Sequence, residues 1–250
     1  TFALTSNLSA SSDGEMLLKK NNPAEIKDCW EGFNRASFAL NQGLDKVIFK
    51  PVASVYKNLP ITVKGGVSNS LDNLSNLVTI PNNLIQGDLG LAVQNTGRFV
   101  VNTTVGIFGF IDVASRMGFP EYSKEDYGQS LAVNGFGPGC YLVLPVLGPK
   151  TARDAVASIT NFVGGDAWYN VTAARDTQHF SEFDYYSSKV TSGVDFRAKN
   201  FDSIENLNKN SIDFYASVKS LYLQDRQQKI LNTKAVVVTQ NDNDWEEIEN

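Results

Sequence analysis

The feature that most constrains this 250-residue chain is an uncharged stretch of twenty-three residues, 127–149, with the sequence YGQSLAVNGFGPGCYLVLPVLGP. It is apolar enough for a membrane, but five glycines and three prolines interrupt it. Proline removes a backbone donor and clashes with the preceding turn, and glycine in a helix interior costs about 1 kcal/mol, so one spanning helix is excluded. Irregular backbone at bilayer depth needs other protein, or a water-filled cavity, to satisfy its polar groups. We therefore expect helices to surround this stretch.

A second apolar run, 99–111, has the sequence FVVNTTVGIFGFI and lies between Arg98 and Asp112. Its thirteen residues are too few to cross a hydrocarbon core, which needs about 20 helical residues. Taken alone, the run indicates a buried core helix in which Gly106 and Gly109 allow close packing. Two short, glycine-rich apolar runs in one chain instead favour a lipid-facing or re-entrant element.

The charge distribution excludes several classes of partner. The formal net charge is −5, but the last ten residues carry five acids, and the remaining chain has 22 acids and 22 bases. Because bases are nowhere concentrated, we expect no nucleic-acid partner and no polybasic attachment to an anionic leaflet. Residues 1–10, TFALTSNLSA, resemble the remnant of a secretory signal peptide, which would place the protein outside the cytoplasm; the alternative is a disordered arm.

The sequence shows no pattern of catalytic or metal-binding residues. It lacks G-x-S-x-G, H-E-x-x-H and P-loop motifs, and carboxylates such as Asp112, Asp126 and Asp154 suit helix caps or partners of arginine. His179 is the only histidine, which is typical of a structural role. Cys29 and Cys140 can form one disulfide in an exported protein or remain two buried thiols. We expect no enzyme activity, no cofactor and no metal.

Apolar periodicity predicts a mostly α fold. Asp28 and Glu31 resemble a capping box before a helix whose apolar residues recur at 30, 33, 36, 40, 44 and 47, and which we expect to end at Lys50-Pro51 before a short helix through Tyr56. Pro60 precedes a helix with residues 67, 71, 74 and 78 on one face. We expect Pro81 to open a separate brief helix that ends at Gly87.

Further caps and stops divide the rest of the chain. Asp88, Asp112 and Thr151 each precede a predicted helix, and Gly118 and Gly164-Gly165 suit helix ends. One or two helices with a polar, solvent-exposed face follow, and a last helix runs from Asn210-Ser211 to about Ile230. We expect little or no β structure, with 140–147 as an extended loop or a small hairpin. The predicted organisation is an arm at 11–27, one helical domain at 28–231 and a disordered acidic tail at 232–250.

The sequence also resembles the MlaA (VacJ) family over roughly 28–230. The motifs, in the order typical of that family, are WEGFNR (30–35), KPV (50–52), GVSN (66–69), NLIQG (83–87), Arg98-Phe99 with Asn102, GFIDVA (109–114), YGQSL (127–131), Gly135, GPG (137–139), YLVLP (141–145), LGP (147–149) and Arg153-Asp154. The structural-motif residues are Phe33, Asn34, Arg35, Arg98, Asn102, Asp112, Arg153 and Asp154. DFRA (195–198) and YLQ (222–224) are weaker matches.

The resemblance implies an outer-membrane component of the Mla lipid-asymmetry pathway. Such a protein is a single compact ring-like helical domain on the periplasmic side, in the inner leaflet, with the Gly/Pro-rich loop lining a channel. It removes mislocalised phospholipid from the outer leaflet and passes it to a periplasmic MlaC-type carrier. The implied partners are phospholipid, the outer-membrane bilayer and a trimeric porin. The alternatives are a structural envelope adaptor that braces a porin without lipid transport and, third, a periplasmic hydrolase.

The same resemblance suggests particular residues. The lipid-path candidates are Phe108, Phe110, Asn134, Tyr141, Leu142, Leu144 and Pro145, with Asn134 as a headgroup contact. Plain packing is the alternative for each of them. The family usually has proline where Cys29 and Cys140 stand, so a disulfide tying the first helix to the central loop is a reasonable hypothesis. The family also carries a lipidated N-terminal cysteine, which is not seen before Ser11; we expect attachment through the ring and a porin.

Overall fold

The computed structural model describes residues 26–161, 166–170 and 181–241. Within these ranges the elements are α2 (Glu31–Leu44), the π-helical segment η2 (Asp45–Phe49), α3 (Lys50–Lys57), α4 (Ile61–Ile85), α5 (Leu89–Thr104), α6 (Val113–Arg116), α7 (Tyr127–Val133), β1 (Tyr141–Leu144), β2 (Gly148–Thr151), α8 (Ala152–Thr160), α9 (Glu182–Lys199), α10 (Phe201–Asn210) and α11 (Phe214–Asn241). The expected signal-peptide remnant, most of the arm, the Gly164-Gly165 stop and His179 lie outside the described residues.

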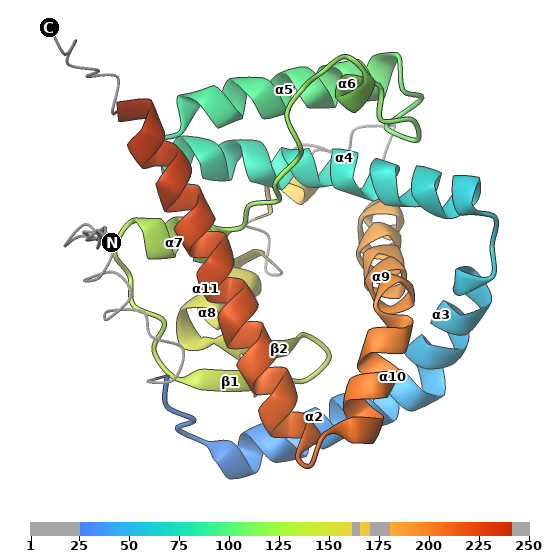
Figure 1. Cartoon of the computed structure of the whole chain (residues 1–250), viewed down its shortest axis with the longest axis vertical. Helices are drawn as coiled ribbons and strands as arrows, with labels where there is room; N and C mark the ends of the chain where they lie inside the picture. Colours follow the sequence, from blue (N-terminus) through green and yellow to red (C-terminus); the bar gives the residue numbers. More distant parts are fainter. Residues whose placement is uncertain (1–25, 162–165, 171–180, 242–250) are drawn as a thin grey trace, which may run out of the picture.

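The helices form a flat ring, which confirms the predicted fold class (Figure 1). In this view α4 and α5 lie side by side along the top, and α3, η2 and α2 continue down the right side and along the bottom. The long helix α11 returns along the left, in front of α7, α8 and the strands, while α9 and α10 lie inside α3. The described β structure is one two-stranded sheet.

The strands form the small hairpin that was one of the two alternatives for 140–147. Strand β1 pairs antiparallel with β2, with Tyr141 opposite Thr151 and Leu144 opposite Gly148. On the other side of β1, the buried amide of Asn34 donates to the Tyr141 carbonyl (3.0 Å) and accepts from the Val143 N–H (2.8 Å). A side chain of α2 thus replaces the missing neighbouring strand. The apolar core beside it consists of Tyr141, Val143, Tyr215 and Leu223.

Local capping chemistry was predicted correctly at three helices. Asp88 accepts from the Leu91 N–H (2.8 Å) at α5, Asp112 accepts from the Ser115 N–H (3.1 Å) at α6, and the Thr151 hydroxyl accepts from the Asp154 N–H (3.2 Å) at α8. Gly87 and Gly118 have φ values of 83° and 86°. These left-handed conformations suit glycine and end the preceding helical turns.

The predicted capping box and both predicted breaks were wrong. Asp28 does not cap α2; its carboxylate accepts from Asn34 (2.6 Å) and from the Tyr215 hydroxyl, so it is engaged in tertiary contacts. At Lys50-Pro51 the chain stays helical through η2, so no break occurs there. The short helix expected after it is confirmed as α3, with Pro51 in its first turn, where no N–H is needed. Pro81 lies inside α4, which therefore runs unbroken for 25 residues.

The last helix is longer than expected. Helix α11 continues past Ile230 to Asn241, so the predicted disordered tail from 232 onward is wrong for 232–241. The remainder of that tail, 242–250, lies outside the described residues. The apolar residues of this segment are consecutive, at 235–238, rather than three or four residues apart, so helical periodicity did not extend to it.

Candidate functional site

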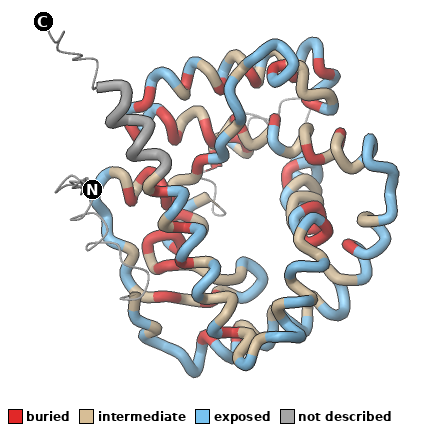
Figure 2. Tube along the Cα trace, viewed as in Figure 1, coloured by how far each residue is buried: buried red, intermediate tan, exposed pale blue. Residues whose placement is uncertain are grey.

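The described residues have an inverted distribution of polar and apolar side chains. Buried polar and charged residues outnumber buried apolar ones, whereas many large apolar side chains are exposed. The predicted apolar face of α2 is an example, since Phe33 is 56% and Leu40 53% exposed. Figure 2 shows α2 and α3 largely in the colour of exposed residues. The apolar stripes that predicted these helices therefore point outward rather than into a core.

The interior between α4, α5 and α7 is a polar seam. Its buried members include Asn73, Asn76, Thr79, Asn82, Asn83, Gln86, Asn95, Asn102, Glu125, Gln129 and Ser130. Gln86 and Gln129 both donate to the Glu125 carboxylate (3.0 and 2.8 Å), and Asn95 donates to Asn83 (2.8 Å). Buried polar groups are stable only when hydrogen-bonded, so this seam fixes the relative positions of the three helices.

The motif residues Arg98, Asn102 and Asp112 lie together at the end of α5. Arg98 is 3% exposed and contacts Asp112 (3.0 Å) and the Pro120 carbonyl (2.7 Å). Asn102 donates to Asp112 (3.0 Å) and accepts from the Ala114 N–H (2.9 Å). Burial raises the pKa of Asp112, but hydrogen bonds from Ser115 and Asn102 and the Arg98 charge outweigh it and lower that pKa. The cluster anchors both ends of the turn between α5 and α6.

That turn holds a strained, apolar tip. Ile107 and Phe108 both have φ of 54°, and Gly109 has 85°, so three consecutive residues are left-handed. This conformation costs roughly 1–2 kcal/mol for a residue with a side chain. Phe108 is 71% exposed, and a Cβ on Gly109 would lie 2.4 Å from Asn73. Strain of this kind persists where the surrounding structure enforces it, and it marks candidate functional segments.

The lipid-path candidates do not lie together in one lining. Phe110 packs its ring over Gly66 in the first half of α4, whereas the Asn134 amide donates to the Ile85 carbonyl at its last residue (3.3 Å). These two α4 positions are separated by roughly 28 Å at a rise of about 1.5 Å per residue. Tyr141 is 0% exposed and packs on Tyr215 and Tyr222, so its assignment to a lipid path was wrong. Leu142 and Leu144 are half-buried in β1, and Pro145 is exposed.

The remaining motif residues have structural contacts. Phe33 is 56% exposed on the outward face of α2. Arg35 bridges Glu31 (2.8 Å) and Asp213 (2.7 Å) on the surface. Arg153 is buried and donates to Asp154 (3.0 Å) and to the Phe136 carbonyl (3.3 Å), which holds α8 against the Gly/Pro-rich loop.

Sequence reasoning missed the charge cluster around Arg226. This buried guanidinium forms a two-pronged ion pair with Asp126 (2.5 and 2.6 Å) and also contacts Asp154 (3.0 Å). It joins α11 to the start of α7 and to α8. The signal was present in the sequence, because Arg226 follows Tyr222 by four residues and lies on the same helical face.

The cluster predicts a dependence of stability on acid. Burial raises the pKa of Asp154, but the charges of Arg226 and Arg153 and the Tyr222 hydrogen bond outweigh it and lower the pKa to about 2. A lowered folded-state pKa stabilises the protein above the unfolded value of 3.8, and this contribution is lost as pH falls toward 2. We expect the unfolding free energy to drop by an amount on the order of 2 kcal/mol across this window. Denaturant unfolding at successive pH values should show a smaller drop for Asp154→Asn than for the wild type or for the surface variant Asp225→Asn.

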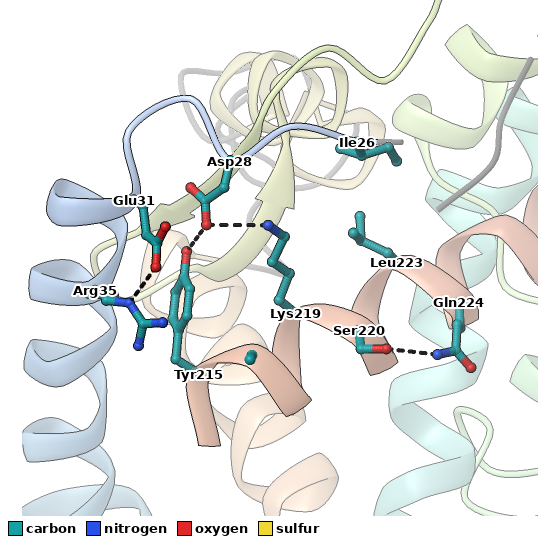
Figure 3. A pocket seen from close by; sticks show the side chains of 10 residues that line it. Ile26, Asp28, Glu31, Arg35, Tyr215, Lys219, Ser220, Leu223 and Gln224 are labelled. Atoms are coloured by element: carbon teal, nitrogen blue, oxygen red, sulfur yellow. Dashed lines mark hydrogen bonds and ion pairs between the residues drawn. The ribbon is translucent and has the colours of Figure 1, made fainter. Parts of the chain in front are cut away.

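A cavity of about 510 Å³ lies between the segment before α2 and the first half of α11 (Figure 3). Figure 3 shows Asp28 facing Tyr215 and Lys219, which lies 3.4 Å away. Burial raises the pKa of Asp28, but hydrogen bonds from Tyr215 and Asn34 and the nearby Lys219 lower it overall. Cys29, beside Asp28, forms a disulfide with Cys140, with their Cα atoms 5.7 Å apart. The charges around this cavity are thus already paired.

Two further properties concern metals and membranes. Within the ranges that the structure covers, no three or more His, Cys, Asp or Glu side chains are grouped so that they could hold a metal ion. Among the same residues, none of the helices combines the length and the apolar character needed to cross a membrane.

Comparison with known proteins gives consistent matches along the chain. A family model described as MlaA lipoprotein matches residues 26–229. An uncharacterised protein of Rickettsia prowazekii is 33% identical over 213 residues, covering 84% of this chain and 81% of the relative. The Escherichia coli protein named intermembrane phospholipid transport system lipoprotein MlaA is 32% identical over 203 residues, covering 79% and 76%. One chain of a solved structure, described as the structural basis for maintenance of bacterial outer membrane lipid asymmetry, matches with a TM-score of 0.67 and 28% identity, covering 82% of this chain and 99% of that chain.

Proposed function

Because this chain belongs to the MlaA lipoprotein family, we propose that it acts in outer-membrane lipid asymmetry as a phospholipid transport component. It takes phospholipid that is misplaced in the outer leaflet and passes it to a periplasmic MlaC-type carrier. The reaction is transfer only, with no covalent bond made or broken. The names of the relatives from Escherichia coli and Haemophilus influenzae, which refer to intermembrane phospholipid transport, support this proposal.

The observation that carries the proposal is the inverted burial within a flat ring. Covering the exposed apolar side chains of α2, α3 and α5 with acyl chains is favourable by about 25 cal/mol of free energy per Å² of apolar surface removed from water. The polar seam keeps hydrogen-bonding groups away from the hydrocarbon. A ring of this kind suits the inner leaflet of the outer membrane, on the periplasmic side, where its helices lie in the leaflet rather than across the bilayer.

Within this proposal the lipid path includes the strained tip and the hairpin. Phe108 and Phe110 contact the acyl chains at the tip, and Leu142, Leu144 and Pro145 of the Gly/Pro-rich loop provide a second apolar surface elsewhere on the ring. The Asn134 amide nitrogen is taken by the carbonyls of Ile85 and Ser130, and no donor among the described residues reaches its Oδ1. That oxygen therefore suits a hydrogen-bond donor on a lipid headgroup.

The second candidate function is an envelope adaptor that braces a trimeric porin without moving lipid. The exposed apolar residues of α2 and α3 favour it as well, because the same face could contact the wall of a porin. The two functions make different demands on the strained tip and the hairpin. Lipid transport requires both segments, whereas bracing a porin requires neither. A periplasmic hydrolase comes third, and release of free fatty acid from phospholipid by the purified protein would identify it.

Deletion of the gene in its host should raise the phospholipid exposed on the cell surface, and a wild-type copy should restore the normal level. We expect a Phe108→Asn copy to restore less than half of it. Asparagine tolerates the left-handed backbone at this position, so the variant removes the apolar contact while easing the strain. The measurement is surface phospholipid, labelled in intact cells.

The matched control is Phe108→Leu, which keeps an apolar side chain and should restore asymmetry at equal protein abundance. If deletion raises surface phospholipid but Phe108→Asn restores it fully, the tip does not contact the lipid. If deletion leaves surface phospholipid unchanged, the transport function itself is wrong and the adaptor becomes the better proposal.

A further inference from the structure

A second, smaller cavity of about 120 Å³ lies between the start of α7, β2, α8 and α11. Its polar lining includes Asp126, Lys150, Asp154, Ser158, Tyr222 and Arg226. None of the residues of the strained tip lines it, and its hairpin residue, Lys150, lies opposite Leu142 of the proposed lipid path. The lining comes from four elements, so the fold rather than one helix end shapes the cavity.

Two hydrogen-bond donors at this cavity lack partners. The ammonium group of Lys150 forms no hydrogen bond or ion pair with any other described residue, although its backbone belongs to the β1–β2 ladder. Arg226 is 8% exposed, and its Nε–H is buried without an acceptor. Both donors belong to cationic groups, so the missing partner is an acceptor and preferably an anion.

The neighbouring carboxylates are already engaged. Both oxygens of Asp126 accept from Arg226, and Asp154 accepts from Arg226, Arg153 and the Tyr222 hydroxyl. The charged residues of the lining are two bases, Lys150 and Arg226, and two acids, Asp126 and Asp154. Because both acids are paired with arginine, Lys150 is the charged group of the lining that has no direct counter-ion.

The pKa of Lys150 is consistent with the lack of a direct counter-ion. Burial lowers the pKa of Lys150, and the positive charges of Arg226 and Lys229 lower it further. Asp126 and Asp154 oppose these effects without overcoming them. An anion bound beside the ammonium would supply the missing counter-charge.

We propose that this cavity binds one phosphate group, either of a phospholipid headgroup or of free phosphate, with Lys150 as its counter-charge. The Ser158 hydroxyl belongs to the same lining and is a further donor. The cavity has room for a phosphate but not for an acyl chain. Binding of a lipid phosphate rests on the proposed transport function, whereas binding of free phosphate does not.

The test is calorimetric titration of the full chain in a non-ionic detergent at low salt. The probes are inorganic phosphate, glycerophosphoglycerol and dihexanoyl phosphatidylglycerol, with uncharged dihexanoylglycerol as the control ligand. Lys150→Gln should weaken binding of the phosphate-bearing probes about tenfold, as expected for loss of one charge-assisted hydrogen bond. Lys150→Arg should retain binding, and Lys209→Gln, an exposed position on α10, should behave like the wild type.

The different probes distinguish the two possible sources of the phosphate group. Binding of phosphatidylglycerol that depends on Lys150 supports a headgroup subsite, and dependence confined to inorganic phosphate or glycerophosphoglycerol supports a site for a free anion. Equal binding by the wild type and Lys150→Gln, or no binding of any phosphate-bearing probe, would overturn the proposal. Circular dichroism of each variant confirms its fold. Because the cell-surface lipid assay does not use these probes, failure here is distinct from failure of the transport function.

Discussion

Replacement of Arg226 by methionine is expected to lower the free energy of unfolding by about 3–5 kcal/mol, the range typical when one partner of a buried ion pair is removed. The guanidinium is the common partner of Asp126, which caps α7, and of Asp154 in α8. Without it, Asp126 loses its ion pair and Asp154 keeps only Arg153 and Tyr222. Chemical denaturation of the detergent-solubilised protein, followed by circular dichroism, measures the change.

Two variants separate the charge effect from loss of packing. Adding Asp126→Asn to the methionine variant should recover part of the stability, because it removes the carboxylate left without its ion pair, while Asp154 keeps its ion pair with Arg153. Lys229→Met, on the exposed side of the same helix, should change stability by less than about 0.5 kcal/mol. A loss below about 1 kcal/mol for Arg226→Met would show that the cluster does not hold α11 to α7 and α8.

The elements that were predicted correctly depend on interactions within a few residues. Asp88, Asp112 and Thr151 cap their helices with side chains that reach three residues ahead, and Gly87 and Gly118 provide left-handed turns. Such contacts are encoded locally. The capping box at Asp28 failed because a distant residue, Tyr215 of α11, supplies the competing hydrogen bond. No local pattern shows that competition.

Periodicity predicted where helices form but not which way their faces point. An apolar stripe on α2 is equally consistent with a protein core and with lipid, and the structure exposes it. The opposite case is seen in α4, where asparagines are buried although asparagine is usually exposed. Asn82 and Asn83 read as surface residues until their partners, Ser130 and Asn95, are brought beside them by folding.

The sequence also indicates which residues are apolar in the candidate site, but not which of them are exposed. The exposed Phe108 and Phe110 were singled out with the help of the family resemblance, but the left-handed tip depends on the packing of Gly109 against Asn73, which the sequence does not show. Tyr141 was misassigned because an aromatic residue in an apolar stretch gives no sign of whether it packs inward. Lys150 was overlooked because its significance lies in the absence of nearby free carboxylates, which only the structure shows.

Loss of the disulfide is the second large effect that we expect. Cys29 precedes α2 and Cys140 precedes β1, and 111 residues separate them in the chain. Cross-linking a loop of about 100 residues restricts the unfolded chain by roughly 4.7 kcal/mol in the entropic account, with typical losses of 2–5 kcal/mol on removal. Replacing both cysteines by serine should therefore lower the unfolding free energy by about 3–5 kcal/mol. Denaturant unfolding with and without a reductant measures it.

The reductant provides the internal control. Reduced wild-type protein should unfold at nearly the same denaturant concentration as the double serine variant, and the variant itself should not respond to the reductant. The hydrogen bonds of Asn34 to β1 do not involve sulfur, so the reduced protein should keep its helical circular dichroism in the absence of denaturant. Labelling of two thiols in the unreduced protein would mean that the bond does not form in solution. The prediction is contradicted if the denaturation midpoint does not change when the disulfide is shown to be reduced. That result would mean that residues 29 and 140 stay close together in the unfolded chain, so that the cross-link removes no conformational freedom from it.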